Sequence, residues 1–102
     1  MNSYLLTYSQ ACLQAQMHNI LNTTPEIDTW VAPFPYAAIL VSRLNVRDLS
    51  NVLRLRLPGV WFMVTEVNGQ NVDGWLPGDL WLYTTDPVEA MQRASVAFSP
   101  VG

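Results

Sequence analysis

The run Val-Trp-Phe-Met-Val at residues 60–64 is apolar at every position. Successive side chains of a strand point to opposite faces of its sheet, so this run predicts a strand that is apolar on both faces. A sheet with helices on one side has to bury one face only. We therefore expect a second covering on the sheet, either a partner molecule or the chain's own C-terminal segment at residues 75–94.

Strand and helix signals alternate along the first part of the chain. Residues 4–8 are rich in aromatic and aliphatic side chains and predict a strand. Ser9 can cap a following helix by accepting hydrogen bonds from its first turn. The core stripe of that helix recurs at helical spacing: Leu13, Met17, Ile20 and Leu21. The helix ends before Pro25, because a proline disfavours helical geometry in the residue that precedes it.

A hairpin and a second helix come next. Residues 28–32 and 36–42 predict two strands, which pair antiparallel through the turn Pro33-Phe34-Pro35. Asn45, with Asp48 three residues later, resembles a capping box and begins the second helix. The apolar face of this helix again follows helical spacing: Val46, Leu49, Val52 and Leu53.

The fourth predicted strand, residues 60–67, follows a stop at Pro58-Gly59, and we expect it to be the most buried strand of the sheet. Beyond it the pattern is less regular. Residues 80–83 fit either a short edge strand or a helical turn. Asp86-Pro87 is a helix start, and this last helix should run to about Ala94.

This order of strand, helix, strand, strand, helix and strand is that of a ferredoxin-like α+β sandwich with an antiparallel sheet. The length of 102 residues suits a single domain. We expect that domain to span residues 1–98, including a C-terminal extension at residues 75–95, and we expect residues 99–102 to be frayed.

Charge is scarce in this chain. Half of the residues are hydrophobic and 13% are charged, which excludes general disorder and favours self-association, with a homodimer as the expected form. The net charge of −3 argues against broad nucleic-acid binding through charge alone. No apolar stretch has the length of a membrane helix, no signal-peptide pattern begins the chain, and a single cysteine cannot form an internal disulfide. We therefore expect a cytoplasmic protein with no membrane partner.

Hydrophobic landmarks are spread over residues 2–82. They are Tyr4-Leu5-Leu6-Thr7-Tyr8, Trp30, Phe62-Met63-Val64-Thr65-Glu66-Val67, Gly74-Trp75-Leu76-Pro77 and Trp81. In this set the chain resembles the SinR-like proteins, which are small ferredoxin-fold proteins related to the CRISPR-associated adaptation protein that dimerises between integrase subunits. The resemblance implies the scaffold of that fold and a dimer.

One position departs from the pattern of the adaptation proteins that resemble metal-dependent nucleases. Those proteins carry an aspartate at the end of the first strand, where this chain has Ser9. A serine hydroxyl is a poor substitute for a carboxylate in binding a hard divalent ion. The departure argues against nuclease activity. We expect a non-enzymatic binding or scaffold protein, with a metal-dependent nuclease and a small-molecule sensing module as the alternatives.

All five cationic side chains are arginines. On an ideal helix Arg43, Arg47 and Arg54 fall within about 40° of each other, because four and seven residues are close to whole turns. The planar fork of arginine suits phosphate and carboxylate recognition, so these three residues are the candidate nucleic-acid or anion site. An ordinary solvated helix face would explain the same pattern.

Four aromatic residues, Trp61, Trp75, Trp81 and Tyr83, are the candidate interface residues. Tryptophan is enriched at interface hot spots, and the low charge favours exposed apolar surface. Packing within the core and a small-molecule pocket are the alternatives for this set.

No residue pattern predicts catalysis. His18 lacks a second histidine with which to build a metal site, and Cys12 is expected to be buried packing. Glu66, Asp73 and Asp79 lie at the end of the fourth strand or after it and are the metal ligands of the nuclease alternative, although strand-end and turn preferences explain each of them. The chain has no glycine-rich phosphate loop and no metal-spaced cysteine or histidine set. We assign no catalytic residue, no metal site and no cofactor.

Overall fold

The computed structural model describes the backbone of residues 1–98 and the side chains of residues 1–94. The elements in chain order are β1 (Asn2–Tyr8), α1 (Gln14–Asn22), β2 (Ile27–Phe34), β3 (Ala37–Ser42), α2 (Val46–Arg56), β4 (Phe62–Val67), the 3-10 helix η1 (Gly78–Trp81), α3 (Leu82–Thr85) and α4 (Pro87–Phe98). The four strands form one antiparallel sheet in the order β2-β3-β1-β4. The predicted ferredoxin-like α+β fold is confirmed, and the tail at 99–102 lies outside the described residues.

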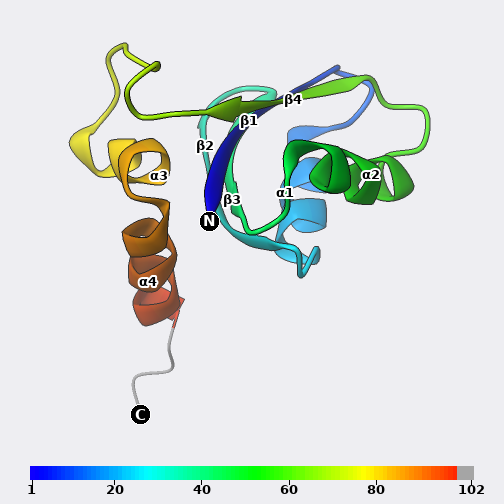
Figure 1. The fold of residues 1–102 in the computed structure, drawn as a ribbon. Helices are drawn as coiled ribbons and strands as arrows, with labels where there is room; N and C mark the ends of the chain where they lie inside the picture. The colour runs from blue at the N-terminus through cyan, green and yellow to red at the C-terminus, as the bar shows by residue number, and fades with distance from the viewer. Residues whose placement is uncertain (99–102) are drawn as a thin grey trace.

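Helices lie on both sides of the sheet. Figure 1 shows α1 and α2 on one side and α3 and α4 on the other. We call the side under α1 and α2 the inner face and the side toward α3 and α4 the outer face. The two faces are closed by different parts of the chain, since α1 and α2 connect strands whereas α3 and α4 follow the last strand.

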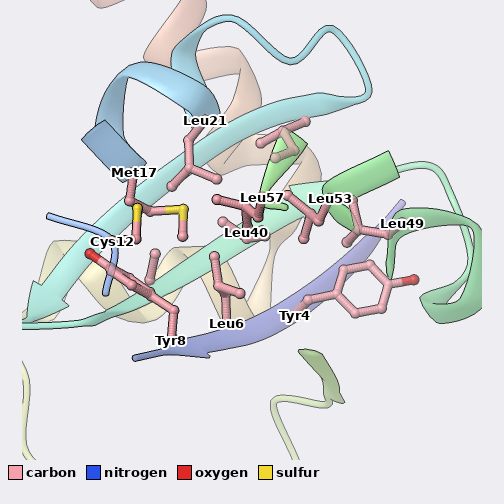
Figure 2. Packing of buried hydrophobic residues seen from close by; sticks show 12 residues of the cluster. Tyr4, Leu6, Tyr8, Cys12, Met17, Leu21, Leu40, Leu49, Leu53 and Leu57 are labelled. Atoms are coloured by element: carbon pink, nitrogen blue, oxygen red, sulfur yellow. The ribbon is translucent and has the colours of Figure 1, made fainter. Parts of the chain in front are cut away.

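The hydrophobic core lies on the inner face (Figure 2). Tyr4, Leu6 and Tyr8 alternate along β1, point to this face and are buried. Leu40 and Ala38 of β3 are paired opposite Tyr4 and Leu6. The helices and their flanking loops complete the core with Cys12, Met17, Leu21, Leu49, Leu53 and Leu57. The inner face is therefore closed by the chain's own helices.

The fourth strand is an edge strand, so the prediction that it is the most buried one is wrong. β4 pairs with β1 alone and begins at Phe62. Trp61 and Met63 are 85% and 67% exposed. β1 and β3 each have a neighbour on both sides and are the buried strands. Hydrophobic content predicted a strand here, but it carries no information about which strands are central.

The first helix begins later than the capping signal at Ser9 predicts. α1 starts at Gln14, after Leu13. The backbone N–H of Ser9 donates to the carbonyl of Trp61 at 2.9 Å, which extends the β1–β4 pairing instead of capping a helix. Leu13 is 61% exposed, so its predicted place in the core stripe is also wrong.

The second helix begins as predicted. The backbone N–H of Asp48 donates to Oδ1 of Asn45 at 2.8 Å, which makes Asn45 the N-cap of α2. Leu49 and Leu53 are buried beneath this helix. Val46 is 39% exposed at the first helical position, so it does not belong to the buried stripe.

The C-terminal segment is helical. Residues 80–83, for which strand and helix were both open, belong to η1 and α3. The N–H of Glu89 donates to Oδ1 of Asp86 at 3.1 Å, which confirms the predicted start of α4. This helix runs to Phe98 and passes the expected end at Ala94. In the described part of the chain, no helix has the length and apolar character needed to cross a membrane.

Candidate functional site on the outer sheet face

Strand register arranges the outer face in rows that each cross all four strands. Residues in register on neighbouring strands point to the same side of a sheet. The first row is Phe34, Ala37, Thr7 and Met63; the middle row is Val31, Ile39, Leu5 and Thr65; the third row is Thr29, Val41, Ser3 and Val67. None of these residues is charged. The outer face is therefore an uncharged surface that is largely apolar.

The C-terminal helices cover the third row. Val41, Ser3 and Thr29 are 0%, 3% and 9% exposed. α3 packs against β1 and β3, and α4 packs against β2. The hydroxyl of Ser3 donates to the carbonyl of Tyr83 in α3, which ties the cover to the central strand. One of the two predicted coverings, the C-terminal segment, is thus present at this end of the face.

The opposite end of the outer face is exposed. Phe34 and Met63 of the first row are 54% and 67% exposed, and Trp61, directly before β4, is 85% exposed. We call Phe34, Trp61 and Met63 the open patch. The middle row lies between the two extremes, since Ile39 is buried and Thr65 is exposed. Covering by the chain itself decreases steadily from the third row to the first.

The structure divides the four predicted interface aromatics. Trp81 and Tyr83 belong to η1 and α3 and are partly buried as part of the cover. Trp61 and Trp75 are exposed, Trp75 at 97% in the loop after β4. Tyr83 accepts a hydrogen bond from Ser3, and Trp61 accepts one from Ser9. Ser3 and Ser9 are six residues apart along extended chain, which corresponds to about 20 Å. Trp61 and Tyr83 therefore lie at opposite ends of the outer face and do not form one cluster.

The sequence pattern does not mark Phe34 and Met63 as candidate site residues. Phe34 lies between two prolines, which predicts a turn, but β2 continues through it and pairs it with Ala37. The apolar run predicts a buried position for Met63, whereas Met63 is exposed on an edge strand. Alternation along an extended chain puts Met63 on the same face as Trp61, and the exposure of that face depends on how far the C-terminal cover reaches.

The arginine face predicted for the second helix is reduced to two residues. Arg43 lies before α2, and its Nη2 is 3.1 Å from Oδ1 of Asp28 in an ion pair. Arg47 and Arg54 are on α2, exposed and seven residues apart, so they share a helix face. Neither forms an ion pair or side-chain hydrogen bond with another described residue. These two arginines are the part of the predicted site that is available to an anion.

Arg54 also borders a groove between α2 and the free edge of β4. The groove has a volume of about 650 Å³, and its lining includes Ser50 and Arg54 from α2 and Trp61 and Met63 from the strand side. No carboxylate is among its lining residues. The structure thus places one predicted cation beside one predicted aromatic, a juxtaposition that the sequence did not indicate.

The carboxylates of the nuclease alternative do not form a metal site. Within the described residues, no group of three histidine, cysteine, aspartate or glutamate side chains could hold a metal ion. Glu66, Asp73 and Asp79 are all exposed. Oδ1 of Asp73 accepts a hydrogen bond from the N–H of Gly74 at 2.7 Å, which is a turn interaction. The structure therefore supports the turn interpretation of Asp73 and does not support the metal-dependent alternative.

The remaining reactive side chains have packing partners. His18 lies against Trp30, with ring centroids 4.9 Å apart and an angle of 37° between the planes. Cys12 is 4% exposed in the core, and burial raises the pKa of its thiol. A raised pKa keeps the thiol protonated at neutral pH, which is unfavourable for a nucleophile. Cys12 is a buried packing residue, as predicted, and His18 packs against Trp30.

Comparisons with known proteins do not assign this chain to a family. No protein-family model, no curated protein and no solved structure matches it. The resemblance to SinR-like proteins therefore stays a hypothesis that rests on the landmarks in the sequence.

Proposed function

We propose that this protein is a non-enzymatic binding or scaffold protein that self-associates through the open patch and the adjoining middle row. The observation that carries the proposal is the graded covering of one uncharged sheet face, buried at Val41 and exposed at Met63. Exposed apolar surface at the end of an otherwise packed face is typical of an interaction site. A second copy of the chain is the partner we propose.

Charge supports a second copy as the partner. In a two-fold dimer the same surface meets itself, so a surface with charge of one sign would face the same sign on its copy. The three rows of the outer face contain no charged residue, and the whole chain has only 13% charged residues. An uncharged apolar face can therefore be buried against its own copy without leaving a charge unpaired.

The area of the open patch sets a condition on such a dimer. Phe34, Trp61 and Met63 expose on the order of 400 Å² between them, from the usual areas of large side chains. A standard interface buries about 800 Å² on each partner. The dimer must therefore include the middle row and neighbouring loops as well as the open patch.

The test is the oligomeric state of the wild-type protein and of matched variants. Sedimentation equilibrium or light scattering should show a concentration-dependent dimer, and Met63→Glu should shift it to monomer by burying an unpaired charge. Leu55→Glu is the control, because Leu55 is 85% exposed on α2, away from the outer face. A wild-type monomer up to about 100 μM, or equal effects of the two substitutions, would contradict the proposal.

A second candidate role is association with single-stranded nucleic acid at the groove between α2 and β4. The specific observation in its favour is that Arg54 and Trp61 border one groove without a carboxylate. Arginine would contact phosphate, and the indole would stack on a base. Fluorescence anisotropy with a labelled oligothymidine should show salt-dependent binding that weakens in Arg47→Gln/Arg54→Gln. Unchanged binding in that double variant would show that Arg47 and Arg54 do not contact the nucleic acid.

A further inference from the structure

A cleft of about 660 Å³ opens at the free edge of β2. Its walls come from α1, from β2 and from Ala94 of α4. The volume lies within the range of about 300–1,000 Å³ that small-molecule sites occupy. β2 and β4 are the two opposite edges of the sheet, so this cleft is separate from the groove beside β4.

Asp28 lines this cleft, and one of its two carboxylate oxygens is buried without a hydrogen-bond partner among the described residues. It occupies an irregularity in the pairing of β2 with β3, between Ile27 and Thr29, and such bulges redirect a side chain. Its side chain is only 9% exposed. Oδ1 accepts a hydrogen bond from Arg43, whereas Oδ2 is shielded from solvent and has no partner among the described residues. A buried carboxylate oxygen without a donor is unfavourable and rare, so this atom indicates a missing hydrogen-bond donor.

The charges around the cleft favour a cation as that donor. Asp28 is the carboxylate among the lining residues, and no arginine is among them. Arg43 reaches Oδ1 from outside the lining, and its side chain is 76% exposed. Ion pairs with such an exposed arginine are held weakly. A stronger donor in the cleft would take the place of Arg43, and rotation of the carboxylate would bring Oδ2 to it.

The indole of Trp30 lines the cleft together with the carboxylate of Asp28. Nε1 of Trp30 donates to Oδ1 of Asn22 at 2.9 Å, which fixes the indole and satisfies its polar atom. His18 packs against the same indole. The rest of the lining is mainly aliphatic, including Leu21 and Val31. A fixed indole next to a carboxylate suits an organic cation, because the ring attracts the cation and the aliphatic wall holds its body.

We propose that this cleft binds a small organic cation, with an ammonium, amidinium or guanidinium group on Asp28 and an aromatic or aliphatic body against Trp30. The site does not depend on the proposed dimer, since the open patch contributes no residue to its lining. It would give the fold a ligand-sensing role in addition to self-association.

Three molecules of the same shape and different charge test the proposal: benzamidine, benzamide and benzoate. Titration of the ¹⁵N-labelled full chain should show benzamidine binding in the millimolar range, with shifts at the Trp30 indole and at Thr29. Benzamide should bind at least about tenfold more weakly, because it lacks the charge that strengthens the hydrogen bond to a carboxylate. Benzoate should not shift these signals.

Two substitutions should act in opposite directions on benzamidine affinity. Asp28→Asn should weaken binding by about tenfold or more, since it removes the charge and keeps the shape. Arg43→Gln should strengthen binding several-fold, because it removes the competing partner of Asp28. Asp48→Asn, an exposed carboxylate on α2 that does not line the cleft, is the control and should have no effect.

Several results would overturn the proposal. These are equal binding of the three molecules, shifts that map away from the cleft, absence of benzamidine binding to the wild-type protein, or unchanged affinity in Asp28→Asn. If Asp28→Asn fails to fold, two other measurements still test the proposal. These are the affinities of benzamidine and benzamide for the wild-type protein and the expected rise in benzamidine affinity in Arg43→Gln.

Discussion

Both faces of the sheet carry apolar side chains, but the two faces are covered in different ways. On the inner face, Tyr4, Leu6 and Tyr8 are buried along the whole length of β1. On the outer face, burial ends partway, from Val41 at 0% exposed to Met63 at 67% exposed. The first face is closed within the chain, and the second is closed at one end only.

The difference follows from connectivity. α1 and α2 each join two strands, so their ends are held at the sheet and their apolar stripes must pack along it. α3 and α4 are joined to the sheet at one end, through the loop that follows β4. Their reach sets how much of the outer face they cover (Figure 1). A covering that is appended to a fold can leave part of a face available, whereas a covering built into the strand connections cannot.

The largest expected effect is on the inner face. Leu6→Ala should lower the free energy of unfolding by about 2–5 kcal/mol, because Leu6 is fully buried and its removal leaves a cavity. Urea denaturation measures the change. Leu55→Ala, at an exposed position, should stay within about 0.5 kcal/mol of the wild type. Similar values for the two variants would mean that the inner core is not the main source of stability.

The second largest effect on the free energy of unfolding is expected at the covered end of the outer face. Val41→Ala should lower the free energy of unfolding by about 1–3 kcal/mol, since fewer atoms are removed than from leucine but Val41 is 0% exposed beneath the cover. The same urea experiment measures it. An effect near zero would show that the C-terminal helices do not stay on the third row in solution.

Alkaline pH should lower the stability of the protein through the buried tyrosines of the inner face. Burial raises the pKa of Tyr4 and Tyr8 above the ordinary value of 10.0. Above about pH 10 the unfolded chain loses phenolic protons that the folded chain keeps, so stability is complete below that pH and falls as the pH rises through it. Thermal unfolding between pH 8 and pH 11 should show the loss. Tyr8→Phe should reduce the loss, and an identical pH profile in that variant would exclude a contribution from Tyr8.

The smallest expected effect on stability is at the open patch. Met63→Ala should change the free energy of unfolding by less than about 0.5 kcal/mol at low protein concentration, because Met63 is mostly exposed. The same variant should weaken self-association, measured by sedimentation at high concentration. A loss of stability as large as that of Val41→Ala would show that the first row is packed and that the two ends of the face do not differ.

Local patterns predicted the elements well and their environment less well. Asn45 and Asp86 cap the helices that they were expected to begin, and Gly59, with φ of 74°, follows Pro58 where α2 was expected to stop. Ser9 has the chemistry of a cap but does not cap α1, because the residues that follow it are not helical and α1 begins only at Gln14. A capping residue acts only if the following turn is helical, and that depends on the rest of the fold.

The candidate site was less predictable than the fold. Trp61 and Trp75, the interface candidates from the sequence, are exposed, whereas Phe34 and Met63 join the exposed surface through strand register. The sequence pattern places Asp28 in a strand, and an irregularity in the β2–β3 pairing buries its carboxylate beside Trp30. Register and bulges are set by pairing between distant segments, so a local pattern cannot reveal them.

The sequence by itself determined the order of the elements and the existence of a second apolar face that needs a cover, because hydrophobic periodicity and capping are local properties. The tertiary structure decided that β4 is an edge strand, that the C-terminal helices cover the third row, and that Phe34, Trp61 and Met63 are left exposed. Burial depends on which segments meet in space and on how far an appended helix reaches. The run at residues 60–64 therefore contributes Trp61 and Met63 to the exposed surface that we propose is available to a second copy.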